Sequence, residues 1–404
     1  MLRKVVNTCN MYVVLWLLGY IQNMYFNSSF LSMVFYIPFT LITIYYIKDV
    51  VFKYHAGGVM KVMMYFFLFL CVYGIGLLIY NDAEGQDPKS FLMMLFSSLG
   101  PIFPFYVFTK RGDLTIEKIK ICFVVFLSVA IMEYFVYEQK AMMLLMLNSS
   151  FDEITNNSTY YFVALLPFIF FFNKKPFVQY LLIACIMGFV LSGMKRGAIL
   201  ISTILLLWFV VRTMKDASTK KRLWVICILL LFVFIGFHFV ENLYNTSDYF
   251  QKRMEDTASG QSSGRDRLYS TYWSHYINND NIVQLLFGEG AYHTENILHL
   301  KAHNDWLELL IDCGLCGAIL YFVYWYSFFK MWKKSKVFHV YYSVVGACLL
   351  YTFIRTFFSM SFSDMPFSMC MLLGYTFAMD WRNLYSINYG KNIVMARSIY
   401  SHDG

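Results

Sequence analysis

The sequence predicts an all-α integral membrane protein of about twelve transmembrane helices, with one large extracytoplasmic loop, residues 243–304, between the ninth and the tenth. Hydrophobic residues make up 59% of the 404 positions and charged residues only 14%, whereas a soluble domain carries about 25% charged residues. The apolar runs approach the roughly 20 residues that a helix needs to cross a bilayer. Composition therefore excludes a soluble enzyme and favours a single polytopic membrane domain over residues 1–404.

The expected spans follow one another with short polar breaks, and the sixth to the eighth are the shortest. The first apolar run lacks the small-residue cleavage site of a signal peptide, so we take it as the first span. In chain order, the expected spans lie near residues 6–25, 29–47, 60–80, 90–109, 119–138, 159–172, 177–193, 198–211, 223–242, 305–329, 340–358 and 365–380.

Basic residues alternate between the polar breaks in a way that indicates orientation. If the N-terminus with Arg3 and Lys4 is cytoplasmic, 23 of the 33 Lys and Arg residues fall in cytoplasmic segments and nine in outer ones, with Arg355 in or near a span. Cytoplasmic loops of membrane proteins carry this excess of positive charge. The pattern predicts that both chain ends are cytoplasmic, and it accounts for the net charge of +8 without a nucleic-acid partner.

The nine cysteines lie in or beside apolar runs, where cysteine acts as a small hydrophobic residue. No disulfide framework is expected. Cys313 and Cys316 form a C-x-x-C pair, but inside an expected helix and without the second ligand pair of a zinc site. We therefore expect neither zinc binding nor redox chemistry at this pair.

Two groups of cations break the charge rule on the expected outer face. Lys195 and Arg196 lie in the short turn Gly193–Gly197 between two spans, and Arg265 and Arg267 lie in the large loop. Cations with so little polar cover are costly at a membrane unless an anion or a water-filled cavity receives them. The phosphorylated head group of a lipid would be such an anion.

The large loop and the start of the tenth span carry an ordered set of short motifs. They are Ser263-Gly264-Arg265, Trp273, Phe287-Gly288-Glu289-Gly290 and His303-Asn304, the last separated by nine residues from Gly314-x-x-Gly317, with an earlier turn Ser192-Gly193-Met194-Lys195-Arg196-Gly197. This set, over about residues 185–325, resembles the bacterial O-antigen polymerase and O-antigen ligase superfamily. The ligase pattern usually has Thr after the second Gly of Gly-x-x-Gly, so Ala318 at that place favours a polymerase.

The resemblance implies a multi-pass enzyme of the bacterial inner membrane that extends surface polysaccharide. The donor would be an oligosaccharide on undecaprenyl pyrophosphate, and an acceptor sugar hydroxyl would attack its anomeric carbon on the outer face, without metal or nucleotide. A flippase and a chain-length regulator of the same pathway are the expected protein partners. Three alternatives stay open: an O-antigen ligase that moves the finished glycan to lipid A core or to protein, a flippase of lipid-linked oligosaccharide, and a peptidoglycan glycosyltransferase.

The expected phosphate-binding residues are the cations that break the charge rule. A departing pyrophosphate gathers negative charge, and a guanidinium group can bind two phosphate oxygens at once. Arg265 is expected to be catalytic in this sense, and Arg196 and Arg267 are further candidates. The inserted residue in the earlier turn leaves open whether Lys195 or Arg196 fills the family's arginine role.

The expected base is His303, because histidine titrates near neutral pH and the attacking hydroxyl must lose a proton. Asp305 and Glu308 have the spacing of a capping pair, so the tenth span should start at about residue 305. The positive end of that helix would keep a neighbouring His303 neutral. Asn304 and His293 are expected to bind the substrate.

Two further pairs of residues are expected to be structural. Gly314 and Gly317 would lie on one helix face and let a neighbouring helix approach closely. Arg355 and Asp364 flank the last outer turn, where an ion pair between them is favoured over a contact with substrate.

The charge pattern makes a testable prediction of topology. Reporter fusions after Lys175, Lys220 and Lys336 should report the cytoplasm, and fusions near Asn148 and Ser262 the outer compartment, because positive charge is retained on the cytoplasmic side. Paired alkaline phosphatase and fluorescent-protein fusions measure this. An external signal at Lys220 together with a cytoplasmic one at Ser262 would contradict the orientation.

Overall fold

The computed structural model of the chain describes residues 7–26, 29–79, 88–146, 158–193, 195–215, 217–246, 251, 254–255, 265–298 and 300–379. Over these residues the chain forms helices and no strand, as the all-α class requires. Ser263, Gly264 and Met194 of the motifs lie outside the described residues, and so does most of the expected loop before Arg265.

Every expected span coincides with helical structure. The principal helices are α1 (Thr8–Tyr25), α2 (Ser29–Phe52), α3 (Gly58–Ile79), α4 (Pro88–Ser98), α5 (Ile102–Lys110), α6 (Ile116–Met146), α7 (Thr159–Val163), α8 (Pro176–Ser192), α9 (Arg196–Lys215), α10 (Thr219–Thr246), α12 (Arg265–Ile277), α13 (Ile282–Phe287), α14 (His293–Leu298), α15 (Asp305–Lys334), α16 (His339–Arg355) and α17 (Phe367–Ala378), with the 3-10 segments η3 (Leu166–Phe172) and η4 (Ser335–Val337).

Two of the expected spans are divided into shorter segments. Gly100 and Pro101 separate α4 from α5; a proline cannot donate the helical hydrogen bond, and it disfavours helical backbone at the residue before it. The turn is tight, since a Cβ on Gly100 would lie 2.5 Å from the carbonyl oxygen of Phe96. The sixth span consists of α7 followed by η3, which has a proline in its first turn.

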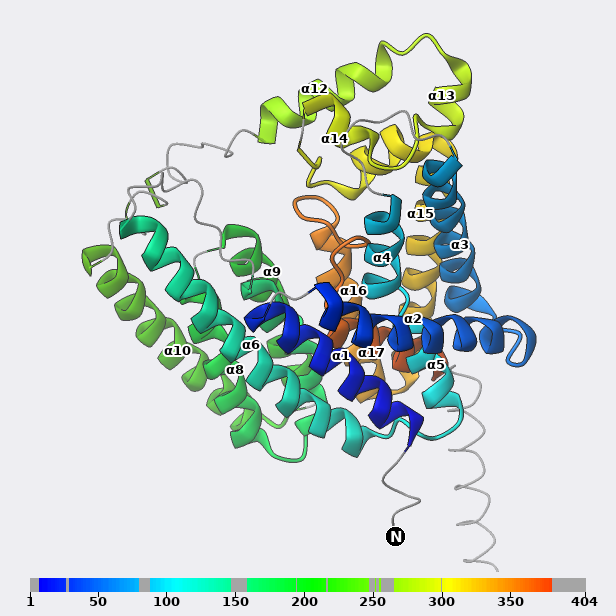
Figure 1. Ribbon diagram of the computed structural model, residues 1–404. Helices are drawn as coiled ribbons and strands as arrows, with labels where there is room; N and C mark the ends of the chain where they lie inside the picture. The colour runs from blue at the N-terminus through cyan, green and yellow to red at the C-terminus, as the bar shows by residue number, and fades with distance from the viewer. Residues whose placement is uncertain are drawn as a thin grey trace, which may run out of the picture.

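Six helices are long and apolar enough to cross a membrane, among the residues searched. They cover Phe30–Phe52, Gly58–Gly76, Ser90–Lys110, Ile116–Gln139, Arg196–Lys215 and Asp305–Lys334, and three shorter apolar helices cover Thr159–Phe172, Pro176–Ser192 and Phe367–Ala378. An α-helical membrane protein is thus supported. The count of twelve spans remains a prediction. Figure 1 shows that α2 runs across the direction of α3, so these two helices are not parallel neighbours in the bundle.

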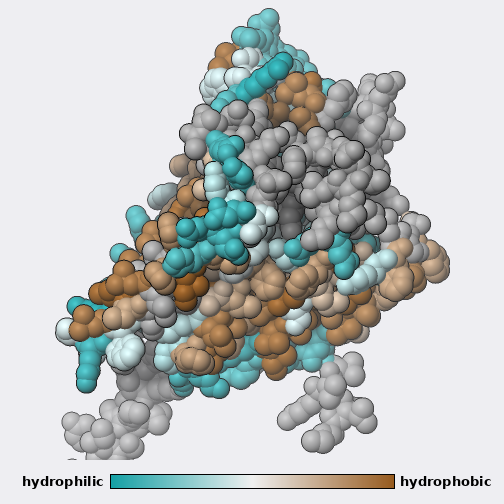
Figure 2. Space-filling model, turned by 90° about the vertical axis from the view of Figure 1, so that its left-hand side faces the viewer, coloured by the Kyte–Doolittle hydropathy of each residue, from teal (hydrophilic) through white to brown (hydrophobic). Residues whose placement is uncertain are grey.

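The surface divides by polarity as a membrane protein requires. In Figure 2, apolar side chains cover much of the middle and lower part of the described face. Polar side chains gather at the upper end and along the lower edge. Many exposed apolar residues belong to the long helices, including Leu41 at 61% and Phe234 at 62% relative exposure, and lipid can cover such residues without the cost of hydrating them.

The centre of the body is α17, whose residues from Phe367 to Ala378 are all buried. It packs on α5, while α15 packs on α3 and α16 on α9. Gly374 makes a close approach to α5, because a Cβ there would lie 2.6 Å from the carbonyl oxygen of Ile102 and 2.9 Å from the amide nitrogen of Tyr106.

The segment between α10 and α15 is the large loop of the sequence prediction. Its described part folds into α12, α13 and α14, which lie beyond the end of the bundle at which α15 begins (Figure 1). Its position outside the cytoplasm remains a prediction.

The packing of α17 predicts a sharp effect of one methyl group. Gly374→Ala should destabilise the protein by about 1–3 kcal/mol, because its Cβ meets backbone atoms that cannot move aside. Gly188→Ala on α8 is the matched control, since its Cβ would have no neighbour within 4 Å. Thermal unfolding of the detergent-purified variants measures both, and equal unfolding temperatures would contradict the close packing.

Candidate functional site

The start of α15 is fixed by a side-chain cap. Asn304 has the extended backbone of a cap residue, and its side-chain oxygen accepts hydrogen bonds from the amides of Trp306 at 3.0 Å and Leu307 at 3.3 Å. The expected helix start at about residue 305 is confirmed. The expected capping pair of Asp305 and Glu308 is wrong, because both of those side chains are buried against the protein rather than turned to the helix end.

The Asp305 carboxylate joins α15 to the chain that follows α16. It accepts hydrogen bonds from the amide of Ser361 at 3.0 Å and from the Tyr321 hydroxyl at 2.5 Å. The Asp305 amide donates in turn to the carbonyl oxygen of Thr356 at 2.9 Å. The end of the bundle at which α15 begins is therefore tied to the turn between α16 and α17.

His303 stands immediately before the helix cap in an uncommon backbone conformation. Its φ is +51°, in the left-handed region, which costs a residue with a side chain roughly 1–2 kcal/mol. Its carbonyl oxygen accepts a hydrogen bond from the hydroxyl of Tyr269 on α12, at 3.3 Å, and the same hydroxyl donates to the carbonyl oxygen of Phe357 at 3.0 Å. Contacts with the rest of the protein thus hold the backbone of His303 in an energetically unfavourable conformation.

Three cations influence the His303 imidazole electrostatically. The residue is exposed overall, yet partial burial of its ring lowers the pKa of His303 below the ordinary value. Positive charge lowers the pKa further, from Arg265 first and then from Lys195 and Lys301. His303 is consequently neutral at pH 7, as a base must be. The structure brings together three residues predicted from sequence, His303, Arg265 and Lys195, from three separate segments.

Tyr160 of α7 is a buried side chain near Arg265. Gly197 at the start of α9 comes so close to the Tyr160 hydroxyl that a Cβ would collide with it, which places the preceding Arg196 close to Tyr160 as well. Arg265 is close enough to Tyr160 for its positive charge to interact electrostatically with the Tyr160 hydroxyl. The guanidinium carbon of Arg355 lies 4.9 Å from the centre of the Tyr160 ring.

Arg355 itself has a structural role. It is fully buried and forms an ion pair with Asp364, with 2.5 Å between its Nη2 and the carboxylate oxygen. Its Nη1 donates to the Tyr351 hydroxyl at 3.2 Å and to the Asp364 carbonyl oxygen at 2.7 Å. The expected ion pair is therefore confirmed, and the charge of Arg355 is compensated within the protein.

Three of the residues predicted to bind substrate either do not point toward the His303 side chain or have a contact elsewhere in the protein. Arg267 is exposed, and, two residues after Arg265 on α12, it points away from the side of the helix on which Arg265 lies. The side-chain oxygen of Asn304 caps α15, and its amide nitrogen donates to the Phe357 carbonyl oxygen at 3.4 Å. His293 faces Glu289, with 2.7 Å between its Nε2 and a carboxylate oxygen.

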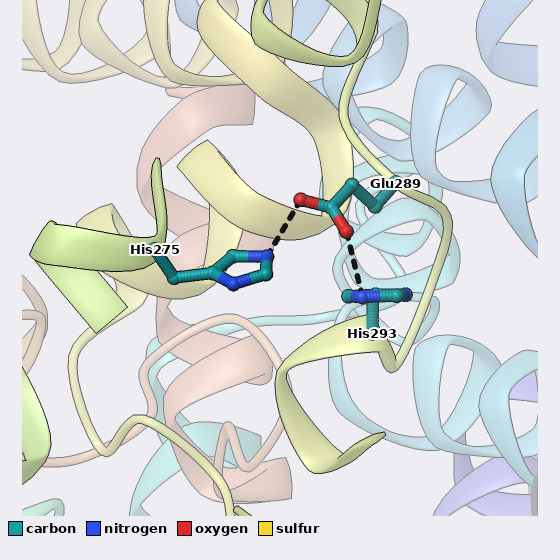
Figure 3. Close-up of side chains that lie close together, drawn as sticks. All are labelled: His275, Glu289 and His293. Carbon is teal, nitrogen blue, oxygen red and sulfur yellow. Dashed lines mark hydrogen bonds and ion pairs between the residues drawn. The ribbon is translucent and has the colours of Figure 1, made fainter. Parts of the chain in front are cut away.

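His275 is a residue that the sequence analysis missed. Its Nε2 lies 2.8 Å from the other carboxylate oxygen of Glu289, so that two imidazoles converge on one carboxylate (Figure 3). The ligand atoms of His275, Glu289 and His293 all lie within 4.8 Å of one another. Among the described residues, these three therefore form a group that is able to hold a metal ion. Burial lowers the pKa of His293, against an opposing effect of Glu289.

The motif glycines lie where two stretches of backbone meet. A Cβ on Gly314 would lie 2.5 Å from the amide nitrogen of Gly288, and a Cβ on Gly288 would collide with the carbonyl of Asp312. Gly314 has φ +64° and ψ −167°, which kinks α15. Its expected structural role is confirmed, but the partner is the Gly288 turn and not another helix. Gly317 does face a helix, since its Cβ would lie 3.4 Å from the Phe69 ring of α3.

The comparison with protein families agrees with the motifs. Residues 180–322 match the family model described as O-antigen ligase. Over these residues the chain is similar to the O-antigen ligase family, and the match supports the O-antigen ligase and polymerase superfamily. It contains Lys195, Arg196, Arg265, His303 and both motif glycines. A search of curated proteins gave no match. An O-antigen polymerase or ligase type of activity, that of a membrane glycosyltransferase-like enzyme, is supported over this part of the chain.

The cations around His303 predict the pH dependence of glycan transfer. Because the pKa of His303 is lowered, the neutral base should persist at pH 6.5, and the rate should fall only at lower pH as the ring gains a proton. Lys301→Gln removes one of the charges that lower this pKa, so the acid limb should move to higher pH by less than about half a unit. Rate profiles from pH 5 to pH 8 measure this; Lys330→Gln, exposed near the other end of α15, should leave the limb in place. A downward shift for Lys301→Gln would contradict the electrostatic assignment.

Proposed function

We propose that the protein is a polymerase of surface polysaccharide, such as O-antigen, capsule or exopolysaccharide repeat units. It transfers a glycan from undecaprenyl pyrophosphate to an acceptor sugar hydroxyl on the outer face of the bacterial inner membrane. The observation that supports this best is the group of cations, Arg265, Lys195 and Lys301, around a neutral His303 at the end of the bundle where α15 begins. A base beside a cluster of positive charge suits a reaction in which a hydroxyl loses its proton while a phosphate leaves.

The leaving group accounts for the cations. As the bond between the anomeric carbon and the phosphate oxygen breaks, the electron pair goes to undecaprenyl pyrophosphate. Arg265 at the first turn of α12 can bind two of its oxygens, and Lys195 adds a point charge. Arg196, beside Tyr160, is a further ligand for the donor phosphates. These side chains supply the charge that stabilises the departing group, so the proposed step requires no metal ion.

The base accounts for His303. The acceptor hydroxyl gives its proton to the neutral imidazole as its oxygen forms the new bond to the anomeric carbon. The cations that keep His303 neutral are the same ones that attract the donor phosphates, and therefore the base stands next to the bond that breaks. The resulting imidazolium is then close to the departing pyrophosphate and can return the proton to it or to water.

A polymerase is favoured over a ligase by one residue. Ala318 follows Gly317 where the ligase pattern usually has Thr. The ligase alternative keeps the same donor chemistry and differs in its acceptor, lipid A core or protein instead of a glycan. The flippase alternative would need ionisable groups along a path through the membrane, whereas the charges around His303 gather at one end of the bundle.

The test of the proposed function is in vitro chain extension with a lipid-pyrophosphate glycan. His303→Ala should lose roughly 10² to 10⁴ in turnover, the usual contribution of a positioned base, while donor binding survives. His303→Gly should be equally inactive but relieves the left-handed backbone, so its stability should equal or exceed that of the alanine variant. His238→Ala is the matched control, because His238 on α10 is an exposed histidine beside Glu241. Near-normal turnover by His303→Ala would remove the base assignment.

The arginine is tested in the same assay. Arg265→Ala should abolish extension and weaken donor binding, and Arg265→Lys should recover only part, since an ammonium cannot reproduce the planar fork. Arg222→Ala is the control, because this exposed arginine lies at the start of α10. Transfer to lipid A core, with no extension of the glycan, would establish the ligase alternative instead.

A further inference from the structure

The α12–α14 loop contains a cluster of two histidines and one glutamate that the proposed reaction does not use. His275 comes from α12, Glu289 from the turn before α14, and His293 from the first residue of α14. The two ring Nε2 atoms lie 2.8 Å and 2.7 Å from different oxygens of the same carboxylate. Figure 3 shows both rings directed at Glu289.

We propose that His275, Glu289 and His293 bind a divalent transition-metal ion, with zinc the best match to the donor set. Two imidazole nitrogens and a carboxylate oxygen are a common set of three protein ligands for zinc, with a fourth position open to water. Magnesium and calcium favour sites made of oxygen atoms alone, so two imidazoles argue against them. The side chains are 35%, 10% and 29% exposed for His275, Glu289 and His293, so an ion can reach them from solvent.

The geometry needs little change to accept an ion. Zinc lies about 2.0–2.2 Å from such nitrogen and oxygen ligands, which are then roughly 3–3.5 Å apart. All three ligand atoms already lie within 4.8 Å of one another. Small rotations of the two rings would replace the contacts to Glu289 with bonds to a shared ion.

The ligands are held by backbone contacts, as a preformed site requires. The amide of Glu289 donates to the carbonyl oxygen of Ile311 at 2.9 Å, which fixes the backbone of Glu289 against α15. The side-chain nitrogen of Asn279 donates to a carboxylate oxygen of Glu289 at 3.0 Å. One turn before His275, the Tyr272 hydroxyl donates to the Thr294 carbonyl oxygen at 3.1 Å, so that α12 and α14 are already joined.

An ion at this place would fasten α12 to the rest of the loop. The Gly288–Gly290 turn packs on α15, and His275 lies on the helix whose first residue is Arg265. The ion would thus fix the direction of α12. That it thereby positions Arg265 rests on the proposed function; the binding of the ion does not.

The experiment measures metal binding by the full-length protein in detergent. After removal of metal by a chelator, titration with ZnCl₂ followed by calorimetry should show one Zn²⁺ per chain with a dissociation constant of about 1 μM or tighter, and Co²⁺ should give the visible absorption of a tetrahedral site. Zn²⁺ should also raise the unfolding temperature, because it binds only the folded protein. A chain that takes up no Zn²⁺ at about 100 μM would overturn the proposal.

Variants assign the binding to these residues. His293→Ala and His275→Gln should each weaken Zn²⁺ binding by at least about 100-fold and abolish the thermal shift; the glutamine can still donate a hydrogen bond to Glu289, which protects the fold. His238→Ala should bind Zn²⁺ like the wild type, because its Glu241 partner has no second histidine beside it. Unchanged binding by His275→Gln and His293→Ala would also overturn the proposal. His303→Ala should bind Zn²⁺ normally even if it loses turnover, so failure of the proposed function and failure of the metal site give different results.

Discussion

The buried carboxylate of Asp305 is the constraint on which the geometry of the site depends. It has no exposed surface, and its oxygens are held by the Ser361 amide and the Tyr321 hydroxyl. A buried carboxylate without such bonds would be very costly, so α15 can begin only where these donors are available. His303 is two residues earlier, and its place follows from that anchor together with the bond from Tyr269. The anchor joins segments that are far apart in sequence.

Two kinds of positive charge lie close together at this end of the molecule. Arg355 is buried, forms an ion pair with Asp364 and lies over the Tyr160 ring, so its charge stabilises the packing around Tyr160. The positive charges of Arg265 and Lys195 both act on His303. The charge of Arg355 is compensated within the protein, and the charges of Arg265 and Lys195 raise the positive potential around His303. This division of roles is what an anionic, lipid-linked donor would require.

The sequence predicted the helices well, because the thickness of a bilayer sets the length of the apolar runs. It also predicted the helix start at about residue 305, whereas the roles given to His303 and Arg265 remain predictions. It failed where distant contacts decide. Asp305 was taken for part of a capping pair, but Asn304 is the helix cap, since the choice between the two depends on donors at Ser361 and Tyr321. His275 could not be found, because only the folding of α12 onto the Glu289 turn brings it to its partners.

Gly288 and Gly314 stand 26 positions apart in the chain, yet a Cβ on Gly288 would meet the backbone of Asp312 and Cys313, and a Cβ on Gly314 would meet the backbone of Leu286 and Gly288. The obstacle on both sides is main chain, which no substitution elsewhere can shorten. A change at one glycine therefore cannot be compensated by a second change nearby, as a crowded side-chain contact often can. Each of the two positions therefore has to be glycine for the two backbone segments to pack as closely as they do. At this contact between the loop and α15, the surrounding side chains can vary, but the two glycines at its centre cannot.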